Sequence, residues 1–281
     1  CQPPDKINLL DEALNIAKEV DEVILLMGTN SDWETEGNDR VDFNLPGEQN
    51  TLIEKVLEIN PNAIIVLNTG SPVDMPWVNK AKSILQSWYA GQEYGNALFE
   101  ILTGLVNPSG KLPTTFPRHI EDTPAYAFYP GENLQMRYDE KLLVGYKWYD
   151  RKNIEPLFHF GHGLSYTDFE YSNLQIINND KNNFTCSFNI KNVGGMPGFE
   201  TSQCYISFMD SDEDEPIKKL QGFDKTYINS GEIEKIEIYL DSKSFSTWNI
   251  KTHQWEIKKG VFNILIGSSS NDVRLKDSIN L

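Results

Sequence analysis

The spacing of apolar residues changes along this chain and divides it into two parts with different fold classes. Leu10, Ala13, Leu14 and Ala17 recur at the i, i+3, i+4, i+7 spacing of an amphipathic helix. From about Asp168 onward, apolar residues instead alternate with polar ones, which is typical of half-buried strands. We therefore expect an α/β part followed by an all-β part.

The first part alternates helical patterns with short apolar runs. Residues 22–28 and 63–67 are apolar on both faces, as in the strands of a parallel sheet. Between them, a helix with Pro46 in its first turn is expected to bury Leu52, Ile53, Val56 and Leu57. The further expected elements are a strand at 84–88 and a helix around 97–102 that ends at Gly104. Parallel strands joined in this way put ligand sites at their carboxyl ends.

The second part has the pattern of a β-sandwich. Residues 107–166 show no sustained period, so we expect an irregular segment that wraps across domains, with short strands at most. The alternating stretches lie at 171–176, 184–190 and 233–239, with turn signals between them. We expect an α/β sandwich domain over 1–118, an irregular linker over 119–166 and an all-β fibronectin type III-like domain over 167–281.

The charge balance excludes several kinds of partner. The 281 residues include 25 Lys and Arg against 41 Asp and Glu, which gives a net charge of −16 at pH 7. Such a chain repels phosphate groups, so we expect neither nucleic acid nor an anionic membrane surface as a partner. The apolar runs at 23–27 and 63–67 are far shorter than the roughly 20 residues that span a bilayer.

The cysteines and histidines point to no metal or organic cofactor. Cys1, Cys186 and Cys204 have no metal-ligand spacing, and we expect Cys186 and Cys204 to be free buried thiols rather than a disulfide pair within one domain. His159 and His162 have no acidic or cysteine ligand close in sequence, so we expect them to pack in a turn. We interpret the acidic run at 210–215 as a solvated loop.

The loop at 31–40 could carry chemistry, because it holds four carboxylates and one arginine directly after a buried strand. Crowded like charges raise the pKa of at least one carboxyl group, as a general acid near neutral pH requires. Three other interpretations compete with this one: a solvated loop, a calcium loop and a helix-capping cluster. The calcium interpretation fails at its twelfth position, where Phe43 replaces the bidentate glutamate.

Residues 31–40 and 45–49 together resemble the second-domain active-site loop of glycoside hydrolase family 3 β-glucosidases, in particular that of fungal members. The similarity continues through short motifs along nearly the whole chain, at residues 95–98, 107–113, 144–149, 160–166, 191–194, 220–223 and 266–269. The resemblance implies three domains: an N-terminal barrel with the nucleophilic aspartate, an α/β sandwich that lends the acid/base, and a fibronectin type III-like domain. The barrel and the start of the second domain are missing here, so we expect an incomplete α/β sandwich.

The resemblance also assigns site residues by position. Glu36, directly before a glycine, matches the general acid/base, and Trp33 and Arg40 match neighbours of the substrate's leaving group. Asn38 stands where the family usually has an aromatic residue. The segment around Asp32 resembles the family's nucleophile motif, but it lies in the wrong domain, so we assign no nucleophile to this chain.

The resemblance implies a retaining β-glucosidase that removes terminal non-reducing β-D-glucose from β-glucosides or cello-oligosaccharides. Without the barrel we expect this chain to be inactive alone, and its partners to be that barrel and, as an option, a second copy. The alternatives are a non-catalytic carbohydrate-binding or scaffold module, and a family 3 β-xylosidase or N-acetylglucosaminidase. One glycosylation sequon at Asn183 permits secretion, but secreted and cytoplasmic locations both stay open.

Overall fold

The computed structural model describes residues 9–37, 39–40 and 42–281. These residues form two compact units, and the division falls between Leu98 and Phe99. The predictions for Cys1, Asn38 and the start of the chain lie outside the described residues.

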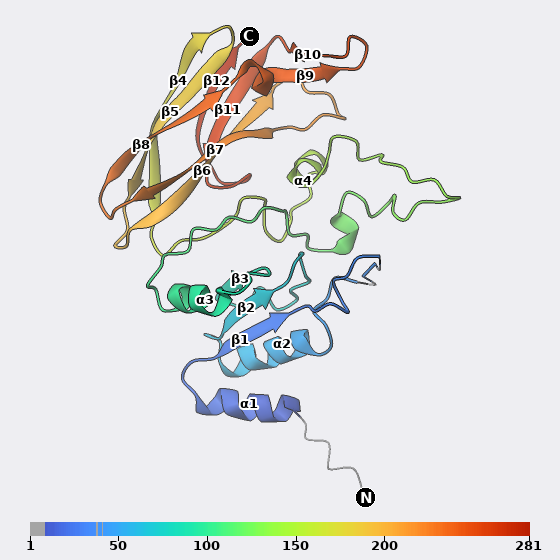
Figure 1. Ribbon diagram of the computed structural model, residues 1–281, viewed down its shortest axis with the longest axis vertical. Coiled ribbons are helices and arrows are strands. Elements are labelled where there is room, and N and C mark those ends of the chain that lie inside the picture. Colours follow the sequence, from blue (N-terminus) through green and yellow to red (C-terminus); the bar gives the residue numbers. More distant parts are fainter. Residues whose placement is uncertain (1–8, 38, 41) are drawn as a thin grey trace, which may run out of the picture. The chain divides into compact units, whose positions relative to one another are not determined.

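The first unit is built on a three-stranded parallel sheet in the order β1-β2-β3 (Figure 1). Its strands are β1 (Ile24–Gly28), β2 (Ile64–Asn68) and β3 (Ser83–Gln86), and its helices are α1 (Leu9–Glu19), α2 (Gln49–Ile59) and α3 (Tyr94–Leu102), which spans the division. Helix α2 lies along one face of the sheet and buries Ile53, Val56 and Leu57. Because the strands are parallel, their carboxyl ends meet at one edge.

These elements confirm the predicted alternation of helices and strands, with two corrections. Pro46 precedes helix α2, whose N-cap is Glu48, because the chain between 42 and 48 forms bends and turns first. Strand β1 is not buried on both faces: Ile24 and Leu26 are 49% and 62% exposed. The described residues leave this face of β1 uncovered, and only the alternate residues are buried.

The second unit contains the predicted β-sandwich (Figure 1). One sheet has the order β12-β11-β6-β7 and the other has the order β4-β5-β8, with antiparallel pairing throughout. A separate hairpin pairs β9 with β10. The strands are β4 (Phe169–Asp180), β5 (Asn183–Asn192), β6 (Gly198–Phe208), β7 (Lys219–Ile228), β8 (Ile233–Leu240), β9 (Ser246–Asn249), β10 (Gln254–Ile257), β11 (Val261–Gly267) and β12 (Val273–Asn280). The parallel α/β part and the antiparallel sandwich together confirm the predicted fold class.

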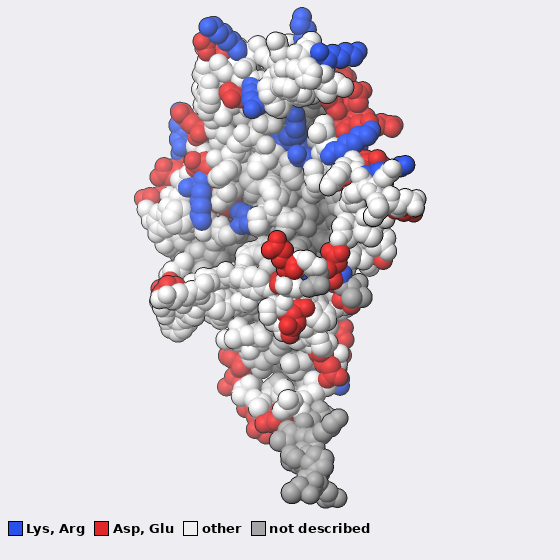
Figure 2. All heavy atoms as spheres, turned by 45° about the vertical axis from the view of Figure 1, so that its right-hand side comes forward, with Lys and Arg blue, Asp and Glu red and all other residues white. Residues whose placement is uncertain are grey.

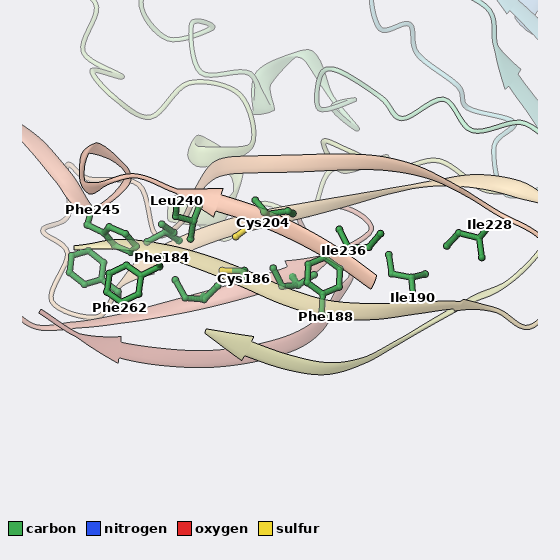
Figure 3. Close-up of a cluster of buried hydrophobic side chains, with 14 residues drawn as sticks. Phe184, Cys186, Phe188, Ile190, Cys204, Ile228, Ile236, Leu240, Phe245 and Phe262 are labelled. Atoms are coloured by element: carbon green, nitrogen blue, oxygen red, sulfur yellow. The ribbon is translucent and has the colours of Figure 1, made fainter. Parts of the chain in front are cut away.

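The core of the sandwich lies between its two sheets (Figure 3). Every second residue of β5 points inward, from Phe184 through Phe188 to Ile190. Cys186 and Cys204 come from opposite sheets, and both are free and fully buried, as predicted. A hydrogen bond with Cys186, together with burial, raises the pKa of the Cys204 thiol well above its usual value. Buried thiols of this kind are poor nucleophiles, so we assign them a packing role.

The irregular segment at 107–166 packs against the outer face of the four-stranded sheet. Helix α4 (Tyr146–Lys152) lies within it, so the expectation of short strands at most is wrong. The Tyr146 ring stacks on Phe160 with 5.0 Å between ring centres and meets Tyr205 of β6 edge-on. The Gln203 side chain donates to the carbonyl oxygen of Gly161 at 3.2 Å. These contacts hold the segment on the sandwich.

A buried ion pair joins the same segment to the sandwich, and its loss should be costly. Lys111 lies 3.5 Å from Glu200, which also accepts a hydrogen bond from the Tyr171 hydroxyl at 2.7 Å. We expect Glu200→Ala to lower the free energy of unfolding by about 3–5 kcal/mol, because Lys111 then loses its charge partner and keeps only the Gly163 carbonyl oxygen at 3.1 Å, while the Tyr171 hydroxyl loses its acceptor. Urea unfolding measures this, with the exposed Glu237→Gln as a control near zero. A loss below about 1 kcal/mol would contradict the role of this pair.

Candidate active site

The loop between β1 and α2 begins at the carboxyl edge of the sheet. Its first turn is closed by backbone hydrogen bonds from Trp33 and Glu34 to the carbonyl oxygen of Asn30, at 3.0 and 2.9 Å. The segments that follow β2 and β3 leave the sheet at the same edge, so the loop lies where a parallel sheet places its ligand sites.

Glu36 and Asp32 are exposed carboxylates of this loop whose side chains have no partner among the described residues, and the resemblance selects Glu36. Glu36 lies in a turn just before Gly37, whose φ of +83° favours glycine. Within the part of the chain that the structure describes, Glu36 makes no hydrogen bond and no ion pair. Its carboxyl group is therefore available to a molecule from outside.

Glu34, two residues earlier, has the opposite environment. Its side chain is 14% exposed, and its carboxylate accepts hydrogen bonds from the Thr29 hydroxyl at 2.9 Å and the Gly70 backbone N–H at 2.8 Å. The hydroxyls of Ser71 and Tyr89 also donate to it. These donors follow β1, β2 and β3, so one carboxylate is bound to the ends of all three strands.

The electrostatics of Glu34 follow from these contacts. Burial by itself raises the pKa of a carboxyl, but the hydrogen bonds from Ser71, Tyr89, Gly70 and Thr29 outweigh it and lower the pKa of Glu34 to about 2. Burial and the neighbouring Glu34 raise the pKa of the Tyr89 phenol. The carboxyl crowding that the sequence suggested therefore does not raise the pKa of Glu34, which stays ionised near neutral pH and cannot donate a proton there.

Arg40 and Trp33, the two predicted substrate neighbours, lie in the same loop. Arg40 donates to the Ser71 hydroxyl at 2.8 Å and to the Asp42 carbonyl oxygen at 3.2 Å, and its guanidinium lies 3.6 Å from Glu34. Its Nη2 group and the Trp33 Nε1 group are buried and have no acceptor among the described residues. In this arrangement Arg40 mainly holds the loop, and its contact with a substrate stays a prediction.

The structure shows no metal site in the residues it describes, since no three His, Cys, Asp or Glu side chains there cluster suitably for an ion. His162 packs against Phe158 with 5.4 Å between ring centres, which confirms the turn packing. For His159 the expected lack of an acidic neighbour is wrong, because Glu155 Oε1 lies 3.2 Å from its Nε2. A bend at Leu157 lies between the two residues.

Charged side chains outside the loop are of both signs. On the face drawn in Figure 2, Lys and Arg of the described residues form no continuous basic patch. The acidic run at 210–215 is held by basic partners: Lys141 pairs with Asp214 at 2.5 Å and Lys258 pairs with Glu215 at 2.5 Å. Of the helices described, none is long and apolar enough to cross a membrane.

Comparisons with known proteins show what this chain is similar to. Residues 7–166 match the model of the glycosyl hydrolase family 3 C-terminal domain, and residues 200–270 match that of the fibronectin type III-like domain. The chain is 43% identical over 276 residues to thermostable β-glucosidase B of Acetivibrio thermocellus, covering 97% of this chain and 37% of that protein. It is 38% identical over 273 residues to a probable β-glucosidase I of Emericella nidulans, covering 94% and 32%.

Solved structures of β-glucosidases are also similar to this chain. The β-glucosidase DesR of Streptomyces venezuelae, in complex with D-glucose, superposes with a TM-score of 0.91 at 36% identity over 97% of this chain and 35% of its own. A family 3 β-glucosidase of Bifidobacterium adolescentis superposes with a TM-score of 0.94 at 33% identity, over 100% and 42%. This chain thus spans about a third of the length of the curated relatives it matches.

Proposed function

This chain belongs to glycosyl hydrolase family 3, and from that membership we propose that it supplies the acid/base loop of a retaining β-glucosidase, with Glu36 as the proton-transferring group. The observation that supports this role is the contrast within the loop. Glu36 is exposed and has no partner among the described residues, whereas Glu34 is held by four donors. A general acid must reach the departing oxygen, and a free exposed carboxyl can do so.

The proposed reaction needs a second carboxylate, an aspartate from a barrel domain outside this sequence. The aspartate attacks the anomeric carbon while protonated Glu36 gives its proton to the glycosidic oxygen, and the bond to the leaving group breaks. The Glu36 carboxylate then takes a proton from water, whose oxygen attacks the same carbon and releases the aspartate. In retaining enzymes the two carboxyls stand about 5–5.5 Å apart.

The substrates we propose are β-glucosides and cello-oligosaccharides with a terminal β-D-glucose. The relatives and structures named above are β-glucosidases, which supports glucose over xylose or N-acetylglucosamine. Kinetics on the three nitrophenyl glycosides would compare these sugars. A preference for the xyloside or the N-acetylglucosaminide would exclude the glucosidase assignment.

Retention of configuration tests the proposed mechanism directly. We expect an enzyme that contains this chain to release β-D-glucose first, because two successive displacements at the anomeric carbon restore its configuration. Proton NMR during early hydrolysis distinguishes the two anomers before mutarotation mixes them. Initial release of α-D-glucose would mean a single displacement and would exclude the covalent intermediate.

A carbohydrate-binding role without catalysis is the second candidate, and exposed aromatic side chains would favour it. Trp248 and Trp255 pair across the β9–β10 hairpin and are 45% and 51% exposed. However, their rings meet at 69°, and Lys243 Nζ lies 4.7 Å from the centre of the Trp255 ring. They therefore form no flat platform for a sugar ring, and the hairpin supports binding less than the loop supports catalysis.

A further inference from the structure

The carboxylate of Glu34 has no part in the proposed proton transfer, yet it has the densest set of hydrogen bonds in the loop. Its donors come from positions far apart in sequence: Gly70 and Ser71 are 36 and 37 residues away, and Tyr89 is 55 residues away. Each donor lies within three residues of the carboxyl end of a strand of the sheet. Glu34 is thus the point at which the loop is attached to the sheet edge.

The backbone around this contact is shaped to allow it. A Cβ atom added to Gly70 would lie 2.9 Å from Glu34 Oε2 and 2.8 Å from the Tyr89 ring, so only glycine permits this close approach. Trp88 has a φ of 54°, which L residues rarely adopt, and it turns the chain directly before Tyr89. The segment after β2 thus needs a residue without a Cβ atom at Gly70, and the segment after β3 has a positive φ at Trp88, next to the donor Tyr89.

We propose that Glu34 is a positioning residue: its carboxylate ties the loop to the ends of β1, β2 and β3 and thereby fixes where Glu36 presents its own carboxyl. Glu36 is two residues further along and has no other described attachment. The inference rests on the proposed function for its catalytic consequence, but the attachment itself concerns this chain alone.

The low pKa of Glu34 agrees with a permanent attachment. A carboxyl whose pKa in the folded chain lies below its ordinary 4.5 contributes stability above that value and loses it as pH falls toward about 2. The attachment should therefore hold fully above about pH 4.5 and weaken only between about pH 4.5 and pH 2.

Amide hydrogen exchange on the 281-residue chain tests the attachment without any catalysis. We expect Glu34→Ala to speed exchange at residues 30–37 and at the Gly70 amide by about tenfold or more, with Glu34→Gln in between because its oxygen still accepts. Tyr89→Phe removes a single donor from a half-exposed side chain and should give a smaller effect in a folded protein. The exposed Glu22→Gln is the control. Unchanged exchange in folded Glu34→Ala and Tyr89→Phe would overturn the proposal.

Kinetics in an enzyme containing this chain separate positioning from mere stability. We expect Glu34→Gln to lower kcat/KM on cellobiose by about tenfold and to leave kcat/KM on dinitrophenyl glucoside nearly unchanged, because kcat/KM reports the first bond cleavage and only a poor leaving group needs a well-placed acid there. An equal loss of kcat/KM on both substrates would contradict positioning. Glu36→Gln is measured in the same assay. If that variant still cleaves cellobiose at the normal rate, the proposed function fails. Hydrogen exchange tests the attachment by Glu34 independently of that result.

Discussion

Glu36→Gln should lower kcat on cellobiose by about 10²–10⁴-fold in an enzyme that contains this chain, because glutamine cannot protonate the departing sugar oxygen. Dinitrophenyl glucoside has a leaving group that departs without a proton, so its first bond cleavage should be almost unaffected. Its glycosyl-enzyme should then accumulate, since no base activates water, and both kcat and KM should fall. Steady-state kinetics on the two substrates measure this difference.

Two additions make the Glu36 experiment specific. Azide needs no general base and should restore turnover of dinitrophenyl glucoside by the Glu36→Gln enzyme, giving β-glucosyl azide. Asp32→Asn is the matched control, because Asp32 is an exposed carboxylate of the same loop to which we assign no role. If Glu36→Gln cleaves cellobiose at the normal rate, or if Asp32→Asn shows the larger loss, another residue is the acid.

The secondary structure was largely predictable because its signals are local. Apolar spacing predicted α1, α2, β2 and three of the sandwich strands, β4, β5 and β8, whose inward side chains face one core. Helix α4 was missed because seven residues are too short to show a helical period, and its ends depend on backbone conformation: Gly145 and Asn153 both have positive φ. The exposed Ile24 and Leu26 were missed because apolar character alone does not say what covers a strand.

The site was predictable only in part, for a different reason. The sequence predicted a carboxylate-rich loop directly after a strand, and in the structure this loop begins at the carboxyl edge of the parallel sheet. Glu34 and Glu36 could not be told apart by environment, because both are glutamates of the same short segment. What separates them are contacts from Gly70, Ser71 and Tyr89, which only the fold brings to one of the two.

The isolated 281-residue chain should fold but show no turnover of nitrophenyl β-glucoside above the uncatalysed rate. Two carboxylates must face the anomeric carbon in the retaining mechanism, one of them as nucleophile. Glu34 cannot serve, because its oxygens are bound by four donors and largely buried. Asp32 lies only four residues from Glu36 in the same loop, and we assign it no catalytic role. The nucleophile is assigned to the barrel. A discontinuous nitrophenol assay at high protein concentration measures any residual rate.

The assay needs a control that distinguishes a missing nucleophile from a misfolded chain. Circular dichroism and a cooperative thermal transition establish that the chain is folded, and Glu200→Ala, which should lower that transition, shows that the measurement responds to packing. Adding azide should leave the rate at background, because azide replaces the water-activating base and not the nucleophile. Turnover that disappears in Glu36→Gln of the isolated chain would place both catalytic carboxyls within these 281 residues and overturn the division of labour proposed between loop and barrel.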